Sequence, residues 1–310
     1  MLVSKQMAVG YRGAPASSIS RDADRVRRTV ALLRRRGFAV TAPRLAAMCL
    51  EGPLSEADVR WAVAASPQLA FAENLVLDCD AVSDARAISS RALGHDAESR
   101  SYVAMTRDFV RTLVAVAPFI RSVSIAGSLA SGGFRPSDDV DLNLIVDDGH
   151  RHLAYVVVNL LGLLHALGHR TKPVDDLTRR PLAPRLMTAN LILEHSQCFP
   201  LERDDEDMAF EFLIGEPVFG AEAITEVVDA NPVLREHFPQ LADRAASLVL
   251  NCPRRLPKLL YPRFLDHPAR ALGQAAWRYM QWTRRHRPEA LARVAYVRST
   301  MRPYTLFDAS

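Results

Sequence analysis

Residues 122–149 read SVSIAGSLASGGFRPSDDVDLNLIVDDG, and this stretch decides the fold that the 310-residue sequence predicts. An apolar strand is interrupted by Gly127 and Ser128, and the next strand begins with alternating aspartates. Successive side chains of a strand point to opposite faces, so Asp139 and Asp141 should project together. Because taking two carboxylates out of water is costly unless a positive group binds them, the pattern predicts a cation site.

The residues around this stretch are typical of a compact α/β unit. The predicted elements, in chain order, are a long helix over 98–117, a strand over 121–126, the Gly-Ser turn, a strand over 139–146, a helix over 153–167 and a strand over 187–194. The predicted fold class is therefore α/β, of the α+β kind.

The residue types in the turn and the second strand indicate which ligand the site takes. Two carboxylates at i and i+2 hold hard cations through oxygen, and Mg²⁺ (or Mn²⁺) prefers one or two carboxylates together with substrate phosphates. Gly127 lets the backbone approach a ligand closely, and Ser128 adds a hydroxyl donor. The predicted ligand is a nucleoside triphosphate that brings its metal ion.

This stretch resembles the signature of the DNA polymerase β-type nucleotidyltransferase superfamily: Gly-Ser, ten intervening residues, then Asp-apolar-Asp-apolar. The resemblance covers roughly residues 100–200, and the order of domains is similar to a bacterial group of stand-alone nucleotidyltransferase-domain proteins. It implies a polymerase β-like core that moves a nucleoside monophosphate from an NTP to an acceptor and releases pyrophosphate. It also implies that Asp139 and Asp141 hold the Mg²⁺ and that Ser128 holds phosphates.

The superfamily usually adds a third carboxylate from the next core strand. In this chain Asn190 occupies that place, and Glu194, on the same face of the strand, could substitute in a different register. Asn190 and Glu194 therefore join Asp139 and Asp141 as the candidate catalytic residues. The candidate nucleotide-binding residues are Gly127, Ser128, Ser131, Arg135 and Lys172. For the last two, a solvated loop side chain is the alternative.

The remainder of the chain predicts two further domains. The expected organisation is a flexible tail over 1–21, a winged-helix-like domain over 22–97, the nucleotidyltransferase core over 98–203 and a helical domain over 204–310. In the winged-helix-like domain, Ser55 should cap a helix together with Asp58, which lies three residues later. A strand is also expected over 71–79. Everything beyond Asp204 is expected to be helical.

Composition and charge indicate which partners and which cellular compartment to expect. Only three of the 39 basic residues are lysines, so the net charge of +4 by itself says little about a nucleic-acid partner. The four scattered cysteines indicate free thiols in a reducing compartment. The first residues lack a secretory signal, and the most apolar run, 153–167, is too short for a membrane span. We therefore expect a cytoplasmic protein without a membrane partner.

The predicted acceptor is a small molecule, with two alternatives. The first is a tRNA- or RNA-directed nucleotidyltransferase; the run 277–298, which mixes aromatic residues with arginine, could follow RNA, although Trp277, Met280 and Tyr296 are expected to be core. The second is a non-catalytic nucleotide- or DNA-binding regulator, suggested by Asn190 and by the arginines of the first helix. Nucleic acid is possible but not favoured as a partner.

Overall fold

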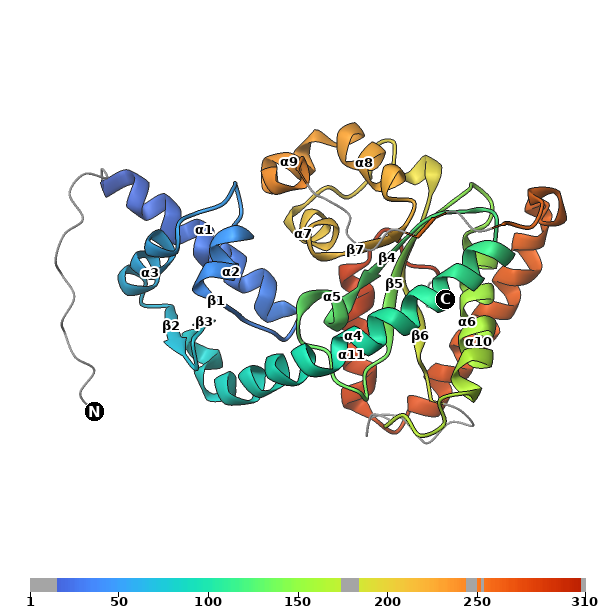
Figure 1. Ribbon diagram of the computed structural model, residues 1–310, viewed down its shortest axis with the longest axis horizontal. Coiled ribbons are helices and arrows are strands. Elements are labelled where there is room, and N and C mark those ends of the chain that lie inside the picture. Colours follow the sequence, from blue (N-terminus) through green and yellow to red (C-terminus); the bar gives the residue numbers. More distant parts are fainter. Residues whose placement is uncertain (1–15, 174–183, 244–249, 252–253, 308–310) are drawn as a thin grey trace.

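The computed structural model describes residues 16–173, 184–243, 250–251 and 254–307 and shows a mixed α/β protein (Figure 1). Its strands form one three-stranded and one four-stranded sheet, which confirms the α+β class. Within the described ranges, none of the helices combines the length and apolar character required to cross a bilayer. Cys49, Cys79 and Cys198 are free thiols, and Cys252 lies outside the described residues.

The N-terminal unit alternates helices and strands around a small antiparallel sheet of order β1-β3-β2. Its elements are α1 (Ala16–Arg35), β1 (Val40–Thr41), α2 (Ala42–Ala47), α3 (Glu56–Ala65), β2 (Leu69–Ala72) and β3 (Leu75–Asp78). The predicted capping box is confirmed, since Ser55 and Asp58 each accept from the other's backbone N–H. The single strand expected over 71–79 is wrong, because Glu73 and Asn74 adopt positive φ and turn the chain into a hairpin.

Two boundaries of this unit differ from the predicted ones. Helix α1 already begins at Ala16, so the last residues of the expected tail over 1–21 are helical, and 1–15 lie outside the described residues. After a 3₁₀ turn, Cys79–Asp84, helix α4 (Ala85–Val116) runs through the boundary expected at 97/98. The first half of α4 buries almost no side chains, so its sequence carries little helical periodicity of apolar residues.

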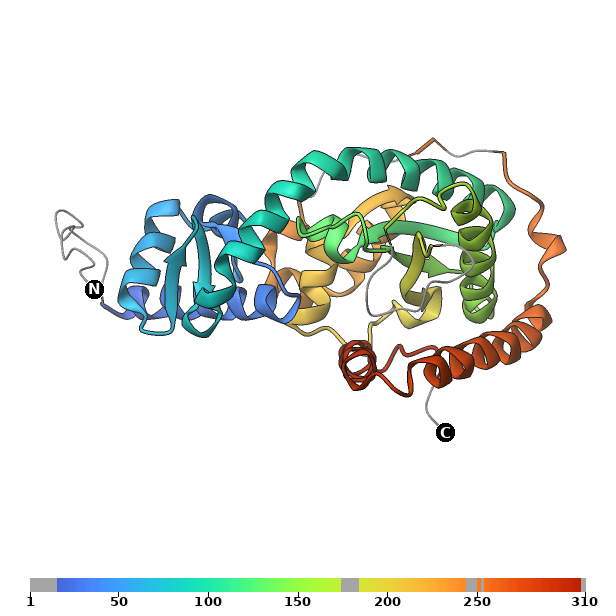
Figure 2. The same ribbon diagram turned by 90° about the horizontal axis from the view of Figure 1, so that it is seen from below.

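The four-stranded sheet has the order β6-β5-β4-β7 (Figure 1), with β5 and β6 parallel and the other neighbours antiparallel. Helix α4, teal in Figure 2, runs from the N-terminal unit along this sheet. Its strands are β4 (Ile120–Ala126), β5 (Val140–Val146), β6 (Met187–Glu194) and β7 (Glu216–Phe219). The crossover helix α6 (Arg151–Leu167) connects the two parallel strands. Helices α4 and α6 pack on one face of the sheet in a continuous apolar core.

The other face of the sheet shares its core with the N-terminal unit. Ile145 and Leu191 of the sheet belong to the same buried cluster as α7 (Glu206–Ile214), α8 (Ala221–Ala230), α9 (Pro232–His237) and helix α1. The N-terminal unit therefore shares its main core with the rest of the protein, and only a small cluster of Ala39, Leu75, Leu77 and Ala85 is separate. This shared packing holds it against the helices that follow residue 204.

The chain beyond Asp204 is not wholly helical, because β7 extends the central sheet beside β4. This strand has only four residues and contains Pro217, which lacks an N–H and fits only an edge position. The remaining elements are short 3₁₀ turns at His195–Gln197, Pro239–Leu241, Lys258–Leu260 and Arg263–Leu265, then α10 (Asp266–Arg284) and α11 (Pro288–Thr300). At Pro239–Leu241 the structure has only a 3₁₀ turn, and 244–249 lie outside the described residues.

Asn231 joins three segments of this half of the protein and should be one of its strongest single contributors to stability. Its side-chain amide donates to the carbonyls of Cys198 and Val227 at 2.8 and 2.7 Å, and its oxygen accepts from Leu201 N at 2.8 Å. The residue is 4% exposed. Replacing it by alanine leaves buried polar groups unpaired and should lower the unfolding free energy by about 2–4 kcal/mol.

Urea unfolding followed by circular dichroism measures this loss. The matched control is Asn159→Ala: among the described residues, the half-buried Asn159 amide donates only to Tyr155 O, within its own helix. That variant should lose less than about 1 kcal/mol. Equal losses of unfolding free energy in the two variants would show that the three Asn231 hydrogen bonds stabilise the protein no more than the single Asn159 bond does.

Candidate functional site

The two aspartates lie at the start of β5, where the sheet begins. Asp139 directly precedes the strand and Asp141 is its second residue. In the parallel register Asp141 lies beside Thr188 of β6, whose hydroxyl donates to Asp141 Oδ1 at 2.7 Å. The carboxylate of Asp139 is partly open to solvent, since its side chain is 39% exposed.

Gly127 approaches Asp141 so closely that only glycine fits. It follows Ala126, which pairs with Asp141 across the antiparallel β4–β5 ladder, and it has φ +60°. A Cβ at this position would overlap Asp141 Oδ2 and lie 3.0 Å from its Cγ. The expected Gly-Ser turn is in fact the beginning of a short helix, α5 (Gly127–Ser131), which ends at Gly132 in the left-handed conformation.

The electrostatic environment of Asp141 disfavours its charged form. Burial, and then the negative charge of Asp139, raise the pKa of Asp141 to about 7, against smaller opposing effects of Thr188 and Arg185. Arg185 lies beside the other carboxylate, with 3.6 Å between its Nε and Asp139 Oδ2, and its side chain is 42% exposed. The two carboxylates thus lie near one partly solvated guanidinium, and the charge of Asp139 also acts on the ammonium group of Lys172.

The donor set fits a hard divalent ion only in part. Carboxylate oxygens are the ligands that Mg²⁺ and Mn²⁺ take, and an ion there would relieve the repulsion that raises the pKa of Asp141. Among the described residues, however, no three His, Cys, Asp or Glu side chains are grouped to hold a metal. The pair therefore suits an ion that completes its shell with water and phosphate oxygens.

The loop before β5 is closed by Asp138. Its Oδ2 accepts from the Ser128 hydroxyl at 3.2 Å and from Arg135 N at 3.1 Å. Ser128 is therefore tied to the loop, although its oxygen can still accept a hydrogen bond. Ser131 is buried and donates to Ser128 O within α5 at 3.3 Å, which directs its hydroxyl away from a ligand. Arg135 is exposed on the loop.

Lys172 serves a different purpose from the phosphate contact that its sequence position suggested. Its Nζ donates to the carbonyls of Ser137, Asp138 and Arg185 at 3.3, 2.6 and 3.0 Å. An ammonium group has three donors, so all are in use. Burial lowers the pKa of Lys172, opposed by Asp139 and Asp138. Lys172 thus fastens the chain on both sides of the aspartate pair.

We expect Lys172→Met to lower the unfolding free energy by about 2 kcal/mol, because three carbonyls of the site lose a charged donor. The matched control is Lys258→Met: the Lys258 side chain is 61% exposed and pairs with Asp147 at the surface. That variant should change stability by less than about 1 kcal/mol. Urea titrations of both variants measure the difference, and a Lys172 loss no larger than the Lys258 loss would refute this structural role.

Asn190 lies on the aspartate face of the sheet but within a separate amide cluster. A bulge in β6 turns it toward β5, where its amide donates to Asn143 Oδ1 at 3.0 Å and to Glu211 Oε1 at 3.2 Å. Asn143 also donates to Glu211 Oε1, at 2.9 Å. The negative charge of Glu211 contributes to the raised pKa of Asp141.

Sequence reasoning missed Thr188, Arg185 and Glu211 as site residues, and Glu211 is the one that comes from outside the sheet and its loops. It comes from α7, a helix that the sequence pattern predicts, but nothing in the pattern indicates which face of that helix packs on the sheet. Beside it an apolar cavity extends between the sheet and α7, lined among others by Ser124, Ile145, Leu191 and Phe212. The cluster therefore lies between the aspartate pair and a cavity of mainly apolar walls.

Glu194 is not brought to the aspartates. In the β5–β6 register it pairs with Val146, at the opposite end of the strands from Asp141. There its Oε1 accepts from Gly149 N at 2.8 Å, and its backbone N–H donates to Gln197. The expectation that it replaces a third acid is wrong, because the bulge at Asn190 does not shift the register far enough to carry Glu194 along the sheet.

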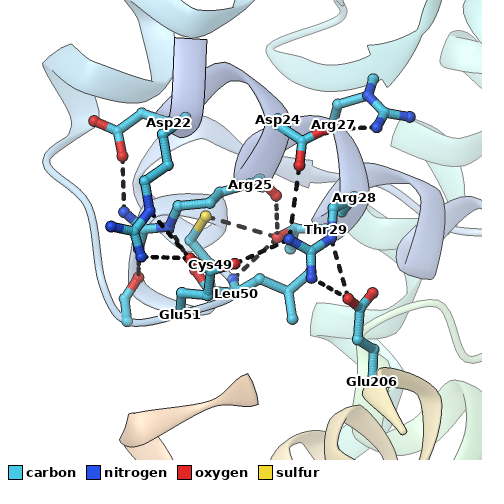
Figure 3. Close-up of polar contacts among 12 residues, drawn as sticks. Asp22, Asp24, Arg25, Arg27, Arg28, Thr29, Cys49, Leu50, Glu51 and Glu206 are labelled. Carbon is cyan, nitrogen blue, oxygen red and sulfur yellow. Dashed lines mark hydrogen bonds and ion pairs between the residues drawn. The ribbon is translucent and has the colours of Figure 1, made fainter. Parts of the chain in front are cut away.

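The N-terminal unit contacts both sides of this site. Arg44 of α2 donates to Ser131 O at 3.1 Å, at the end of the Gly-Ser helix. Arg36, directly after α1, bonds Asp207 at 3.0 Å and lies 3.6 Å from Glu211 Oε2. Figure 3 shows the neighbouring arginines of α1 in contact with acidic groups, including Arg28 with Glu206 of α7. The arginines that suggested DNA binding are thus largely engaged within the protein.

Comparisons with protein-family models, with curated proteins and with solved structures find no match to this chain.

Proposed function

We propose that this protein is an Mg²⁺-dependent nucleotidyltransferase that moves a nucleoside monophosphate from an NTP to an acceptor, with a small molecule as the leading acceptor class. The observation that carries the proposal is the contact between Gly127 and the buried carboxylate of Asp141, beside the more open Asp139. Neither the close approach of Gly127 to Asp141 nor the repulsion between the two carboxylates stabilises the fold. A polyphosphate ligand with its cation accounts for both.

In this proposal Asp139 and Asp141 would hold the ion, and the Gly127–Ser128 segment would lie along the phosphates. Mg²⁺ bound there supplies positive charge for the attacking and leaving oxygens. The acceptor oxygen forms a bond to the α-phosphorus while the bond to pyrophosphate breaks. Lys172 and Thr188 keep the two aspartates in place through the bonds described above, so positioning is the main contribution of the protein.

The fold supports the proposal at a coarse level. A Gly-Ser helix between two antiparallel strands, followed by a crossover to a parallel strand, is the order expected for a polymerase β-like core. The N-terminal order of helix, strand, two helices and hairpin fits a winged-helix-like domain. Its helix α3 begins with Glu56 and Asp58, and α1 is ion-paired, which favours a packing role over DNA binding.

Pyrophosphate release tests this function. Purified protein is incubated with each of the four NTPs and Mg²⁺, with extracts of small metabolites or with bulk tRNA as acceptor source. The proposal expects release that requires one class of acceptor and falls at least about a hundredfold in Asp139→Ala, since the loss of a metal ligand removes charge stabilisation. Failure to release pyrophosphate, together with failure to bind any NTP, would overturn it.

A non-catalytic nucleotide-binding role is the second candidate, because the place expected for a third acid holds Asn190, whose amide cannot act as a base and bonds Asn143 and Glu211. It expects NTP binding without pyrophosphate release. Asn190→Asp separates the two: turnover that appears only in this variant identifies the natural chain as a binding protein. Turnover in the unchanged chain excludes that role.

A further inference from the structure

The C-terminal half of α10 carries two large aromatic side chains in solvent. Tyr279 is 64% exposed and Trp282 is 58% exposed, whereas their neighbours Trp277 and Met280 are only partly exposed. The two exposed rings are roughly parallel, with an interplanar angle of 26° and centroids 6.0 Å apart. Arg285 places its guanidinium 4.2 Å from the centroid of Trp282. Exposed stacked aromatics of this size need an explanation.

These rings share one face of the helix with two arginines. At 100° per residue, Arg278, Tyr279, Trp282 and Arg285 fall within about 120° of the helix circumference. Arg278 and Arg285 are exposed. The result is a stripe on the exposed face of α10 in which two aromatic rings are flanked by two arginines, and we call it the α10 stripe.

Positive charge is concentrated in the same part of the chain. Residues 266–300 contain seven arginines against Asp266 and Glu289, a net charge of +5, while the whole chain carries +4. The other 275 residues are therefore slightly negative, at −1. Within the part of the chain that the structure describes, Arg278 has no ion-pair partner, in contrast to Arg27 and Arg28 of α1, which are paired with Asp24 and Glu206.

We propose that the α10 stripe binds single-stranded RNA. Bases released from pairing stack on exposed aromatic rings and guanidinium planes, and the local positive charge follows the phosphates. RNA is the preferred polyanion because its loops and ends present unpaired bases, whereas a duplex hides them. An anionic lipid surface would match the charge and take aromatic side chains at its interface, but the roughly parallel rings and the guanidinium over Trp282 present flat faces suited to stacking bases. The inference does not rest on the proposed function, because the stripe binds without nucleotide or metal.

Fluorescence anisotropy tests the inference with labelled oligouridine and oligoadenosine of about 12 nucleotides, near the site size of single-strand binders. The protein is the full chain, in EDTA, at about 0.15 M salt. We expect a Kd of roughly 1–100 µM. Tyr279→Ala with Trp282→Ala should weaken binding at least about tenfold, since each stack contributes to affinity. Arg278→Gln with Arg285→Gln should reduce the slope of log K against log salt by about 1.4.

Two matched controls come from the N-terminal unit. Trp61→Ala removes a tryptophan that is 39% exposed on α3, and Arg27→Gln removes an arginine that is already ion-paired. Both should bind RNA as the unchanged protein does. The inference is overturned if oligonucleotides do not bind, if either double variant binds normally, or if blunt duplex RNA, single-stranded DNA or phosphatidylserine vesicles are bound more tightly than the single-stranded RNA.

Discussion

Replacing Asp141 by asparagine should make the ligand-free protein more stable and unable to bind Mg²⁺ with a nucleotide. The pKa of this carboxyl is raised from 3.8 to about 7 in the folded state, with burial as the main cause. At pH values above 7 the folded protein must hold a charge that the unfolded chain holds without cost. The full shift corresponds to about 4 kcal/mol, and since the side chain is not wholly buried we expect a gain of about 2–3 kcal/mol.

The gain should depend on pH with a defined sign. Between pH 3.8 and 7 the folded state binds more protons at Asp141 than the unfolded state, so the stability of the unchanged protein falls as pH rises through this window. The advantage of Asp141→Asn should therefore be near zero at about pH 4 and largest above about pH 7. Urea unfolding with EDTA at both ends of the window measures it.

Asp229→Asn is the matched control, because the Asp229 side chain is 60% exposed and pairs with Arg235 at the surface. It should leave stability within about 1 kcal/mol at either pH. Added Mg²⁺ and NTP at a hundredfold excess over Kd should stabilise the unchanged protein by about 2.7 kcal/mol and Asp141→Asn not at all. A variant that loses stability, or that keeps this ligand effect, would contradict the assigned role of Asp141.

Gly127→Ala should abolish nucleotide turnover while the fold survives. The added methyl group overlaps the end of the Asp141 side chain. In addition, the new alanine must keep φ +60°, which residues other than glycine rarely adopt. The carboxylate can swing away, because it is the free end of a flexible side chain. We expect a loss of about 1–3 kcal/mol in stability and a fall in kcat/KM of about a hundredfold or more, since misplaced catalytic groups are this costly.

The control for this variant is Gly94→Ala. Gly94 lies within α4, and a Cβ there would meet nothing within 4 Å. Alanine should therefore stabilise the helix by about 0.5–1 kcal/mol and leave turnover unchanged. Turnover and thermal unfolding of both variants are measured together. Normal turnover in Gly127→Ala would show that the close approach of glycine to Asp141 has no functional meaning.

The parts of this structure that follow from local patterns could be predicted from the sequence. Strand β6 has the predicted limits, because its apolar run is bounded clearly, and Ser55 caps α3 through a short-range motif. The proximity of Gly127 and Asp141 follows from two adjacent strands joined by one loop. These features require only neighbouring residues and the alternation of a strand.

The parts that depend on distant packing could not be predicted. Strand β7 contains Pro217 and only four residues, so its pairing with β4 is decided by the sheet rather than by propensity. Glu211 reaches the site because α7 packs on the sheet, and Lys172 turns to backbone carbonyls that no spacing identifies. Asn190 stands where the third acid was expected, but its partners depend on a bulge in β6.

Electron paramagnetic resonance of Mn²⁺ tests most directly whether the two aspartates hold a metal ion that accompanies a polyphosphate. Mn²⁺ replaces Mg²⁺ at oxygen ligands, and a non-hydrolysable NTP analogue keeps the complex intact. We predict that the unchanged protein captures Mn²⁺ together with the analogue and that Asp139→Ala and Asp141→Asn each abolish this capture while both remain folded. Capture of Mn²⁺ by either variant as tightly as by the unchanged protein, or no capture by the unchanged protein, would contradict the account.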